Sequence, residues 1–152
     1  MGKVIFIGQS GSGKTTLCQK LNEQALHYRK TQAVECYGKS IDTPGEYLEN
    51  RRLYHALIVT AADARIVALV SDPTSGYHAI PPGFAGMFGK KVIGIVTKIH
   101  QTDEQAVERS RRELERAQAS PVFLVDTPED AGIDALKLYL EKNMGEGLRA
   151  EQ

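Results

Sequence analysis

The chain has 152 residues, which suits one globular domain, and its 41% hydrophobic, 25% charged and 7% aromatic residues exclude a disordered or fibrous protein. Its 19 basic residues balance 19 acidic ones, so no overall charge favours nucleic acid or an anionic membrane surface, and neither is an expected partner. Any anion-binding site must therefore be local.

The cysteines and the apolar runs bear on the cellular compartment. Cys18 and Cys36 lack CxxC spacing, and no secretion signal is recognisable, so we expect no disulfide framework and no thiolate zinc site. Both are expected to be buried small hydrophobic residues. No apolar run reaches the roughly 18 residues of a membrane-spanning helix. We therefore expect a cytoplasmic protein.

The first part of the chain is typical of a strand, a loop and a helix. Residues 3–7 form a nearly continuous apolar run, as in a strand buried on both faces of a parallel sheet. A glycine-rich segment follows, and Leu17 and Leu21, four residues apart, predict a helix with one apolar stripe. Residues 33–42 alternate at a period of two around Gly38-Lys39, which predicts two short strands joined by a tight turn, in an antiparallel edge hairpin.

Strands and helices alternate through the rest of the chain. The predicted elements are a helix at 53–60, strands at 66–70 and 92–96, a charged amphipathic helix at 102–119, a strand at 122–125 and a helix at 133–140. Residues 71–90 are rich in proline and glycine and predict a loop with one short helical turn at 84–88. The pattern predicts a three-layer α/β domain over residues 1–145, with a mostly parallel sheet, one antiparallel edge strand and a loose tail at 146–152.

The glycine-rich segment GQSGSGKT at residues 8–15 fits the GxxxxGK[ST] pattern and has the strand before it and the helix after it that this motif requires. Backbone N–H groups and the helix N-terminus then face phosphate oxygens, Lys14 reaches the terminal phosphates and serves catalysis, and the Thr15 hydroxyl ligates Mg²⁺. The alternative is a flexible glycine turn with a solvated lysine. The nucleotide contacts predicted here are Gly8, Ser10, Gly11, Ser12, Gly13, Lys14, Thr15 and Thr16.

A DxxG element at Asp42 to Gly45 supplies a second set of candidates. The Asp42 carboxylate can hold a Mg²⁺-bound water while the Gly45 N–H meets the terminal phosphate, although an ordinary β-turn explains the same residues. Thr31 can complete Mg²⁺ coordination or be a plain loop threonine. Glu46 stands where many regulatory GTPases have a glutamine that orients water; we include it among the catalytic candidates, although an ionised carboxylate cannot donate a hydrogen bond.

Four stretches of the chain carry a family resemblance: the segment at 8–16, YRKTQAVE at 28–35, IDTPGEYLENRRLYHAL at 41–57 and VIGIVTK at 92–98. Together they make the sequence resemble the EutP/PduV family over nearly all of its length. That family accompanies bacterial ethanolamine and propanediol utilisation, has the fold of small Ras-like GTPases and is linked to metabolic microcompartments. The resemblance implies nucleotide and Mg²⁺ binding by Gly8, Gly11, Gly13, Lys14, Thr15, Thr31, Asp42 and Gly45.

The resemblance also implies an activity, because some members are described as acetate kinases. A carboxylate oxygen then attacks the terminal phosphate directly, and positioning with charge neutralisation suffices. Arg51, Arg52 and His55 lie downstream of the DxxG element, where they can assist or be ordinary surface and packing residues. Acetate or another short carboxylate is the implied substrate, and a shell protein or enzyme of the microcompartment is the implied partner.

The segments expected to contact the nucleotide base, at 97–100 and around Asp126, depart from the GTPase pattern. Thr97-Lys98-Ile99-His100 has a histidine where related GTPases have the aspartate that accepts two N–H bonds from guanine, so ATP and GTP both remain open. Thr97, Lys98 and Asp126 are predicted contacts on this side; Asp103 can substitute for the missing carboxylate or cap a helix. The expected function is a Mg²⁺-dependent NTPase or phosphotransferase; the alternative is a slow GTPase-like switch or assembly protein.

Overall fold

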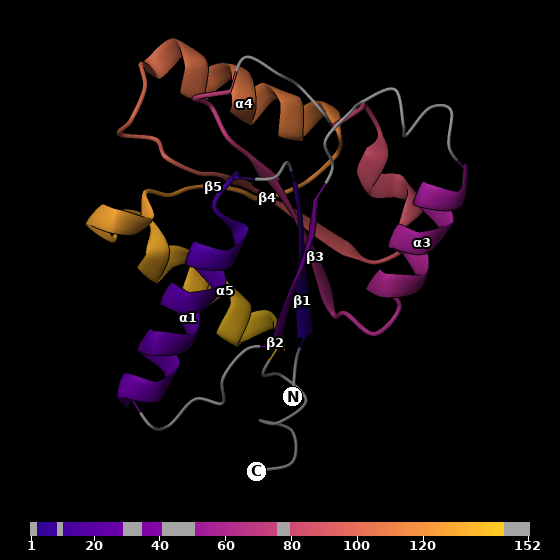
Figure 1. Ribbon diagram of the computed structural model, residues 1–152, viewed down its shortest axis with the longest axis horizontal. Coiled ribbons are helices and arrows are strands. Elements are labelled where there is room, and N and C mark those ends of the chain that lie inside the picture. The colour runs from indigo at the N-terminus through magenta and orange to yellow at the C-terminus, as the bar shows by residue number, and fades with distance from the viewer. Residues whose placement is uncertain (1–2, 9–10, 29–34, 41–50, 76–79, 145–152) are drawn as a thin grey trace.

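Five parallel strands form one sheet in the computed structural model of the protein (Figure 1), in the order β2-β1-β3-β4-β5. The structure describes residues 3–8, 11–28, 35–40, 51–75 and 80–144, and only the backbone of 22–28, 35–40, 51–54 and 144. The elements are β1 (Lys3–Gly8), α1 (Lys14–Tyr28), β2 (Glu35–Ser40), α3 (Arg51–Ala61), β3 (Ile66–Ser71), η1 (Phe84–Met87), β4 (Lys91–Val96), α4 (Glu104–Arg116), β5 (Val122–Leu124), η2 (Thr127–Glu129) and α5 (Ile133–Met144).

Two apolar layers cover the two faces of the sheet. Because side chains alternate along a strand, Val4 and Phe6 of β1 pack with α1 and α5, while Ile5 and Ile7 pack with α3 and α4. The same division runs through β3, whose six residues are all buried. A strand covered on both faces has to be a continuous apolar run, which is why residues 3–7 and 66–70 lack polar alternation. The predicted three-layer α/β architecture is confirmed.

The prediction for residues 33–42 was wrong. Glu35–Ser40 is one strand that runs straight through Gly38 and pairs parallel to β1, with Phe6 opposite Gly38. Among the strands that the structure describes, every pairing is parallel, so the antiparallel edge strand is not found. The register with β1 spans six residue pairs, and this tertiary pairing overrides the local turn preference of Gly38-Lys39.

The remaining elements agree with the predicted ones to within a few residues, apart from the longer α1. The short helical turn expected in the 71–90 segment is η1, and the Asp103 carboxylate caps α4 by accepting a hydrogen bond from the Ala106 N–H at 2.8 Å. Capping is therefore what Asp103 does in this structure. None of the helices in the described ranges combines the length and apolar character needed to cross a bilayer.

The expectation for the cysteines was also wrong. Cys18 in α1 is half-buried against the core and is disulfide-bonded. The chain's other cysteine, Cys36, lies on β2 with its Cα opposite Val4 of β1, and α1 packs across both strands. A helix that crosses two neighbouring strands brings such residues close without any CxxC spacing, so the spacing argument failed.

Candidate functional site

The candidate site lies where the strand order reverses. From β1 the chain first adds β2 on one side and then β3 on the other, so the carboxyl ends of β1 and β3 border a topological switch point. Open α/β sheets bind their ligands at such a point. The glycine-rich loop follows β1, Asp72 follows β3, and Thr97 follows β4 at the same edge (Figure 1).

Close packing and unusual backbone conformation explain two of the loop's glycines. A Cβ on Gly8 would lie 2.5 Å from the Val70 carbonyl oxygen, so no other residue fits there without a shift of β3. Gly13 has φ +103°, a conformation that L side chains rarely adopt. The loop can therefore bring its backbone against an anion, and α1 begins directly after it without an acidic residue in its first turn. These features fit a phosphate group.

Lys14 is folded back across the loop. Its ammonium donates hydrogen bonds to the Gly8 carbonyl oxygen at 2.9 Å and to Ser12 Oγ at 3.3 Å, and the residue is 8% exposed. Thr15 and Thr16, which directly follow Lys14 in the first turn of α1, are exposed. A cation held over the loop and an exposed hydroxyl beside it are the kind of charge and oxygen ligand that a Mg²⁺-bound triphosphate would need. The structure thus brings together the predicted residues 11–16.

Thr97 joins the loop after β4 to the glycine-rich loop. Its hydroxyl donates to the Ser12 carbonyl oxygen at 2.7 Å, and its backbone N–H donates to the Ser71 carbonyl oxygen at 3.0 Å. Thr97 is 2% exposed and Ser12 1%. A buried carbonyl needs a donor, so this contact holds the conformation of the loop.

Lys98 extends over the glycine-rich loop and is held from two sides. Its ammonium donates to the Gly11 carbonyl oxygen and to Asp72 Oδ2, both at 2.7 Å, and its backbone has φ +55°. Asp72 is itself fixed, because its other oxygen accepts from the Thr74 N–H at 2.8 Å and the Thr74 hydroxyl at 2.6 Å. The sequence analysis missed Asp72, although it directly follows β3 at the edge where ligands bind.

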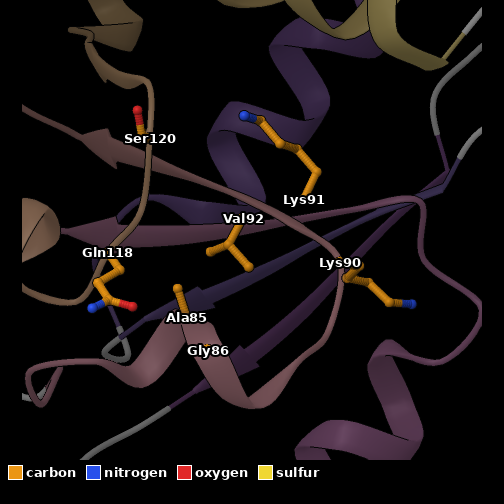
Figure 2. Close-up of a pocket in the computed structure, with 7 residues that line it drawn as sticks. All are labelled: Ala85, Gly86, Lys90, Lys91, Val92, Gln118 and Ser120. Carbon is orange, nitrogen blue, oxygen red and sulfur yellow. The ribbon is translucent and has the colours of Figure 1, made fainter.

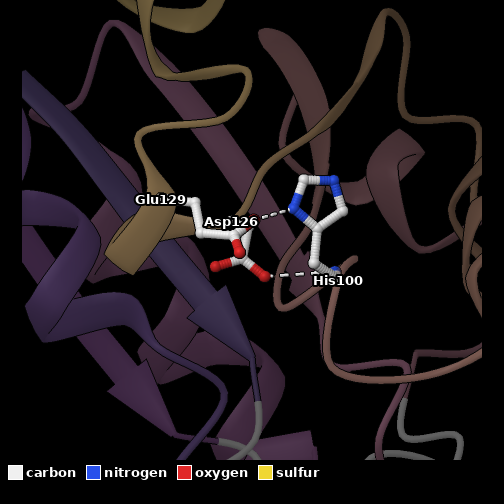
Figure 3. Close-up of side chains that lie close together, drawn as sticks. All are labelled: His100, Asp126 and Glu129. Carbon is white, nitrogen blue, oxygen red and sulfur yellow. Dashed lines mark hydrogen bonds and ion pairs between the residues drawn. The ribbon is translucent and has the colours of Figure 1, made fainter.

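Asp126 and His100 lie together on the next loops of the same edge. The His100 N–H donates to Asp126 Oδ2 at 3.1 Å, and the His100 ring contacts Glu129 through Nδ1 (Figure 3). Asp126 is 2% exposed, so its predicted contact with a base has little surface available in this conformation. What it visibly does is to fix the backbone at His100. Glu129 was not among the predicted residues.

Several predicted residues cannot be placed. Ser10, Thr31, Asp42, Gly45 and Glu46 lie outside the described residues, and so do the side chains of Arg51 and Arg52. His55 is described and is exposed on α3.

A separate cavity of about 310 Å³ lies at the amino end of β4, away from the glycine-rich loop (Figure 2). It is lined by Ala85, Gly86, Lys90, Lys91, Val92, Gln118 and Ser120. The Lys90 ammonium is engaged with the carbonyl oxygens of Ala61, Ala62 and Ala64 at 2.5, 3.1 and 2.8 Å, beyond the end of α3. This lining contains no carboxylate or imidazole, so we assign it no chemistry.

Comparison with known proteins identifies relatives over nearly the whole chain. The family described as "Ethanolamine utilisation - propanediol utilisation" (PduV-EutP) matches residues 1–142. "Propanediol utilization protein PduV" from Citrobacter freundii is 41% identical over 140 residues, covering 92% of this chain and 93% of that protein. "Probable acetate kinase EutP" from Escherichia coli K12 is 33% identical over 142 residues, covering 92% and 89%.

Solved structures with the same fold include nucleotide-binding domains. The FeoB G-domain from Methanococcus jannaschii superimposes with a TM-score of 0.60 at 18% identity, over 96% of this chain and 100% of that one. Translation elongation factor SelB from Methanococcus maripaludis gives a TM-score of 0.62 at 16% identity, over 95% of this chain and 35% of that one. At these identities the likeness shows the fold alone, which is that of the P-loop GTPases.

Proposed function

Because the chain belongs to the PduV-EutP family of ethanolamine and propanediol utilisation, we propose that it binds a Mg²⁺-nucleoside triphosphate and transfers the terminal phosphoryl group to a short carboxylate such as acetate or propionate. The observation that carries the proposal is the glycine-rich loop, with its Gly8 cradle and the Lys14 ammonium folded over it. The "probable acetate kinase" name of one relative supports the choice of acceptor.

In this reaction the protein's own groups bind and position the reactants. The loop N–H groups would hold the phosphates, the Lys14 ammonium would leave the Gly8 carbonyl for the terminal phosphate, and the Thr15 hydroxyl would ligate the metal. Mg²⁺ supplies neutralisation of the phosphate charge. A carboxylate oxygen attacks the terminal phosphorus while the bond to the leaving diphosphate oxygen breaks, giving an acyl phosphate and a nucleoside diphosphate. No proton has to move, so no general base is needed.

The base side is formed by the loops after β4 and β5. We infer that Lys98 covers the purine with its aliphatic stem, that Thr97 and Asp72 hold the surrounding backbone and ammonium, and that Asp126 shapes the pocket through the backbone of His100. ATP and GTP are both candidates, because a histidine replaces the carboxylate acceptor that guanine would use. Thr31, Asp42 and Gly45 remain proposed contacts of the metal and the terminal phosphate, and Glu46 remains a catalytic candidate.

A turnover assay tests the transfer. Purified protein is incubated with Mg²⁺ and ATP or GTP, with and without acetate or propionate, and the nucleoside diphosphate and acyl phosphate are quantified. We expect acyl phosphate that depends on the carboxylate and is lost in Lys14→Ala. Tight nucleotide binding with negligible turnover would contradict the kinase and favour the second candidate, a slow switch or assembly protein acting on a microcompartment shell protein or enzyme in the cytoplasm.

A further inference from the structure

Three potential metal ligands from different loops meet beside the base-side loops. His100 follows β4, whereas Asp126 and Glu129 belong to the segment after β5, and Figure 3 shows their side chains gathered together. One nitrogen or oxygen ligand atom of each residue lies within 4.8 Å of the others. The proposed phosphoryl transfer uses none of these three ligand atoms.

Asp126 is the member of the cluster whose buried carboxylate is least satisfied, since His100 and Glu129 already contact each other. It is 2% exposed, and within the described part of the chain its carboxylate accepts one hydrogen bond, from the His100 N–H to Oδ2, and pairs with no lysine or arginine. Although it precedes η2, it does not cap that helix. Burial of a carboxylate without a cation or several donors is unfavourable. Its second oxygen, Oδ1, is thus a buried anionic ligand with no partner among these residues.

We propose that His100, Asp126 and Glu129 bind a divalent transition-metal ion of the Zn²⁺ type. One imidazole nitrogen and two carboxylate oxygens are ligands that Zn²⁺ accepts, and three protein ligands leave its fourth position open. The imidazole disfavours Mg²⁺ and Ca²⁺, which prefer oxygen ligands alone. This site is separate from the Mg²⁺ proposed for the nucleotide, which hydroxyl and phosphate oxygens would hold.

The geometry needs a modest rotation of exposed side chains. Ligand atoms bound at about 2.0–2.2 Å to one tetrahedral Zn²⁺ lie about 3.3–3.6 Å apart. The present separations are all within 4.8 Å, so the ligand atoms have to shift relative to one another by at most about 1.5 Å. The side chains of His100 and Glu129 are 50% and 59% exposed, so both can rotate toward the buried Asp126 without disturbing the core. A bound ion would fasten the loop after β4 to the loop after β5.

The full-length protein is titrated calorimetrically with Zn²⁺ in the absence of nucleotide and in excess Mg²⁺. His100→Ala and Glu129→Gln remove one ligand each from exposed side chains. The matched control is His55→Ala, an exposed histidine on α3. Thermal unfolding without metal confirms that each variant is folded. Co²⁺ in place of Zn²⁺ gives a visible spectrum that reports the coordination.

We expect one Zn²⁺ per chain in the wild type and in His55→Ala, with affinity reduced at least about tenfold in His100→Ala and in Glu129→Gln. Loss of groups that merely support a ligand already costs about 10- to 100-fold, so a ligand should cost no less. The proposal is overturned if the wild type takes up no Zn²⁺, or if these two variants bind it as the wild type does. Nucleotide binding is measured separately in metal-free protein, so either result leaves the proposed function to its own test.

Discussion

The hydroxyl of Thr97 provides a sharp test of how the glycine-rich loop is held. It is buried and donates to the Ser12 carbonyl oxygen at 2.7 Å, linking residues 85 positions apart in the sequence. Thr97→Val replaces the hydroxyl by a methyl group of similar size and leaves that carbonyl without this donor. Thr97→Ser keeps the hydroxyl and serves as the matched control.

The magnitude follows from the burial of both groups. A buried acceptor that loses its donor costs about 1–3 kcal/mol. In a domain of this size, each 1 kcal/mol lowers Tm by about 2–4 °C. If the loop then spends part of its time in other conformations, the apparent nucleotide affinity is the intrinsic affinity multiplied by the fraction of molecules whose loop can still bind. A free-energy difference of about 1.4 kcal/mol in favour of the other conformations lowers the affinity about tenfold. We therefore expect Thr97→Val to bind nucleotide up to about tenfold more weakly.

Urea unfolding gives the stability change, and calorimetry with Mg²⁺-ATP and Mg²⁺-GTP gives the affinity. Thr97→Ser should be close to the wild type in both measurements, since its hydroxyl can still donate. The reasoning fails if Thr97→Val unfolds and binds like the wild type, or if Thr97→Ser is as defective as Thr97→Val, because the hydroxyl would then not be the group that matters.

Three further predictions concern neighbouring features. Gly8→Ala should destabilise the fold by about 1–3 kcal/mol in urea unfolding, because its Cβ would lie 2.5 Å from a carbonyl oxygen of β3; wild-type stability would show that the strands yield. Asp72→Ala should weaken nucleoside triphosphate binding roughly tenfold, about 1.4 kcal/mol, by releasing the Lys98 ammonium, while inorganic tripolyphosphate binds unchanged; equal losses for both ligands would contradict a base-side role. A hydrogen bond from Arg111 lowers the pKa of Glu108. This carboxylate therefore stabilises the fold above its unfolded-state pKa, and the stabilisation is lost as the pH falls through the folded-state pKa. The Tm of Glu108→Gln should lie below that of the wild type at neutral pH and converge with it in acid, and a Tm difference that does not change with pH would refute the ion pair.

The central part of the fold could be predicted because its signals are local. The apolar runs at 66–70 and 92–96 became β3 and β4, since strands buried on both faces need such runs. The segment at 33–42 could not be predicted, because Gly38 favours a turn locally and only the pairing with β1 makes it a strand. The Cys18 disulfide could not be predicted for the same reason, because it depends on how α1 crosses the sheet.

The candidate site divides in the same way. The glycine-rich loop is a contiguous motif, so Gly8, Lys14 and Thr15 could be named as candidates from spacing alone. Asp72 acts on a lysine 26 residues away, and Glu129 meets a histidine 29 residues away, so neither could be found before the strand order was known. The sequence also could not tell which charged residues of a helix are buried. The helix α4 is a solvated charged helix as expected, yet its Glu113 is buried and accepts a hydrogen bond from the Ser71 hydroxyl at 2.8 Å.

The central claim is that the glycine-rich loop binds the phosphates of a nucleoside triphosphate through Lys14. Calorimetric titration of the wild type and Lys14→Ala with Mg²⁺-ATP and Mg²⁺-GTP measures this directly, with thermal unfolding as a check on folding. We predict that the wild type binds at least one of the two nucleotides and that Lys14→Ala, while still folded, loses this binding. Unchanged affinity in a folded Lys14→Ala variant, or no binding of either nucleotide by the wild type, would contradict the claim.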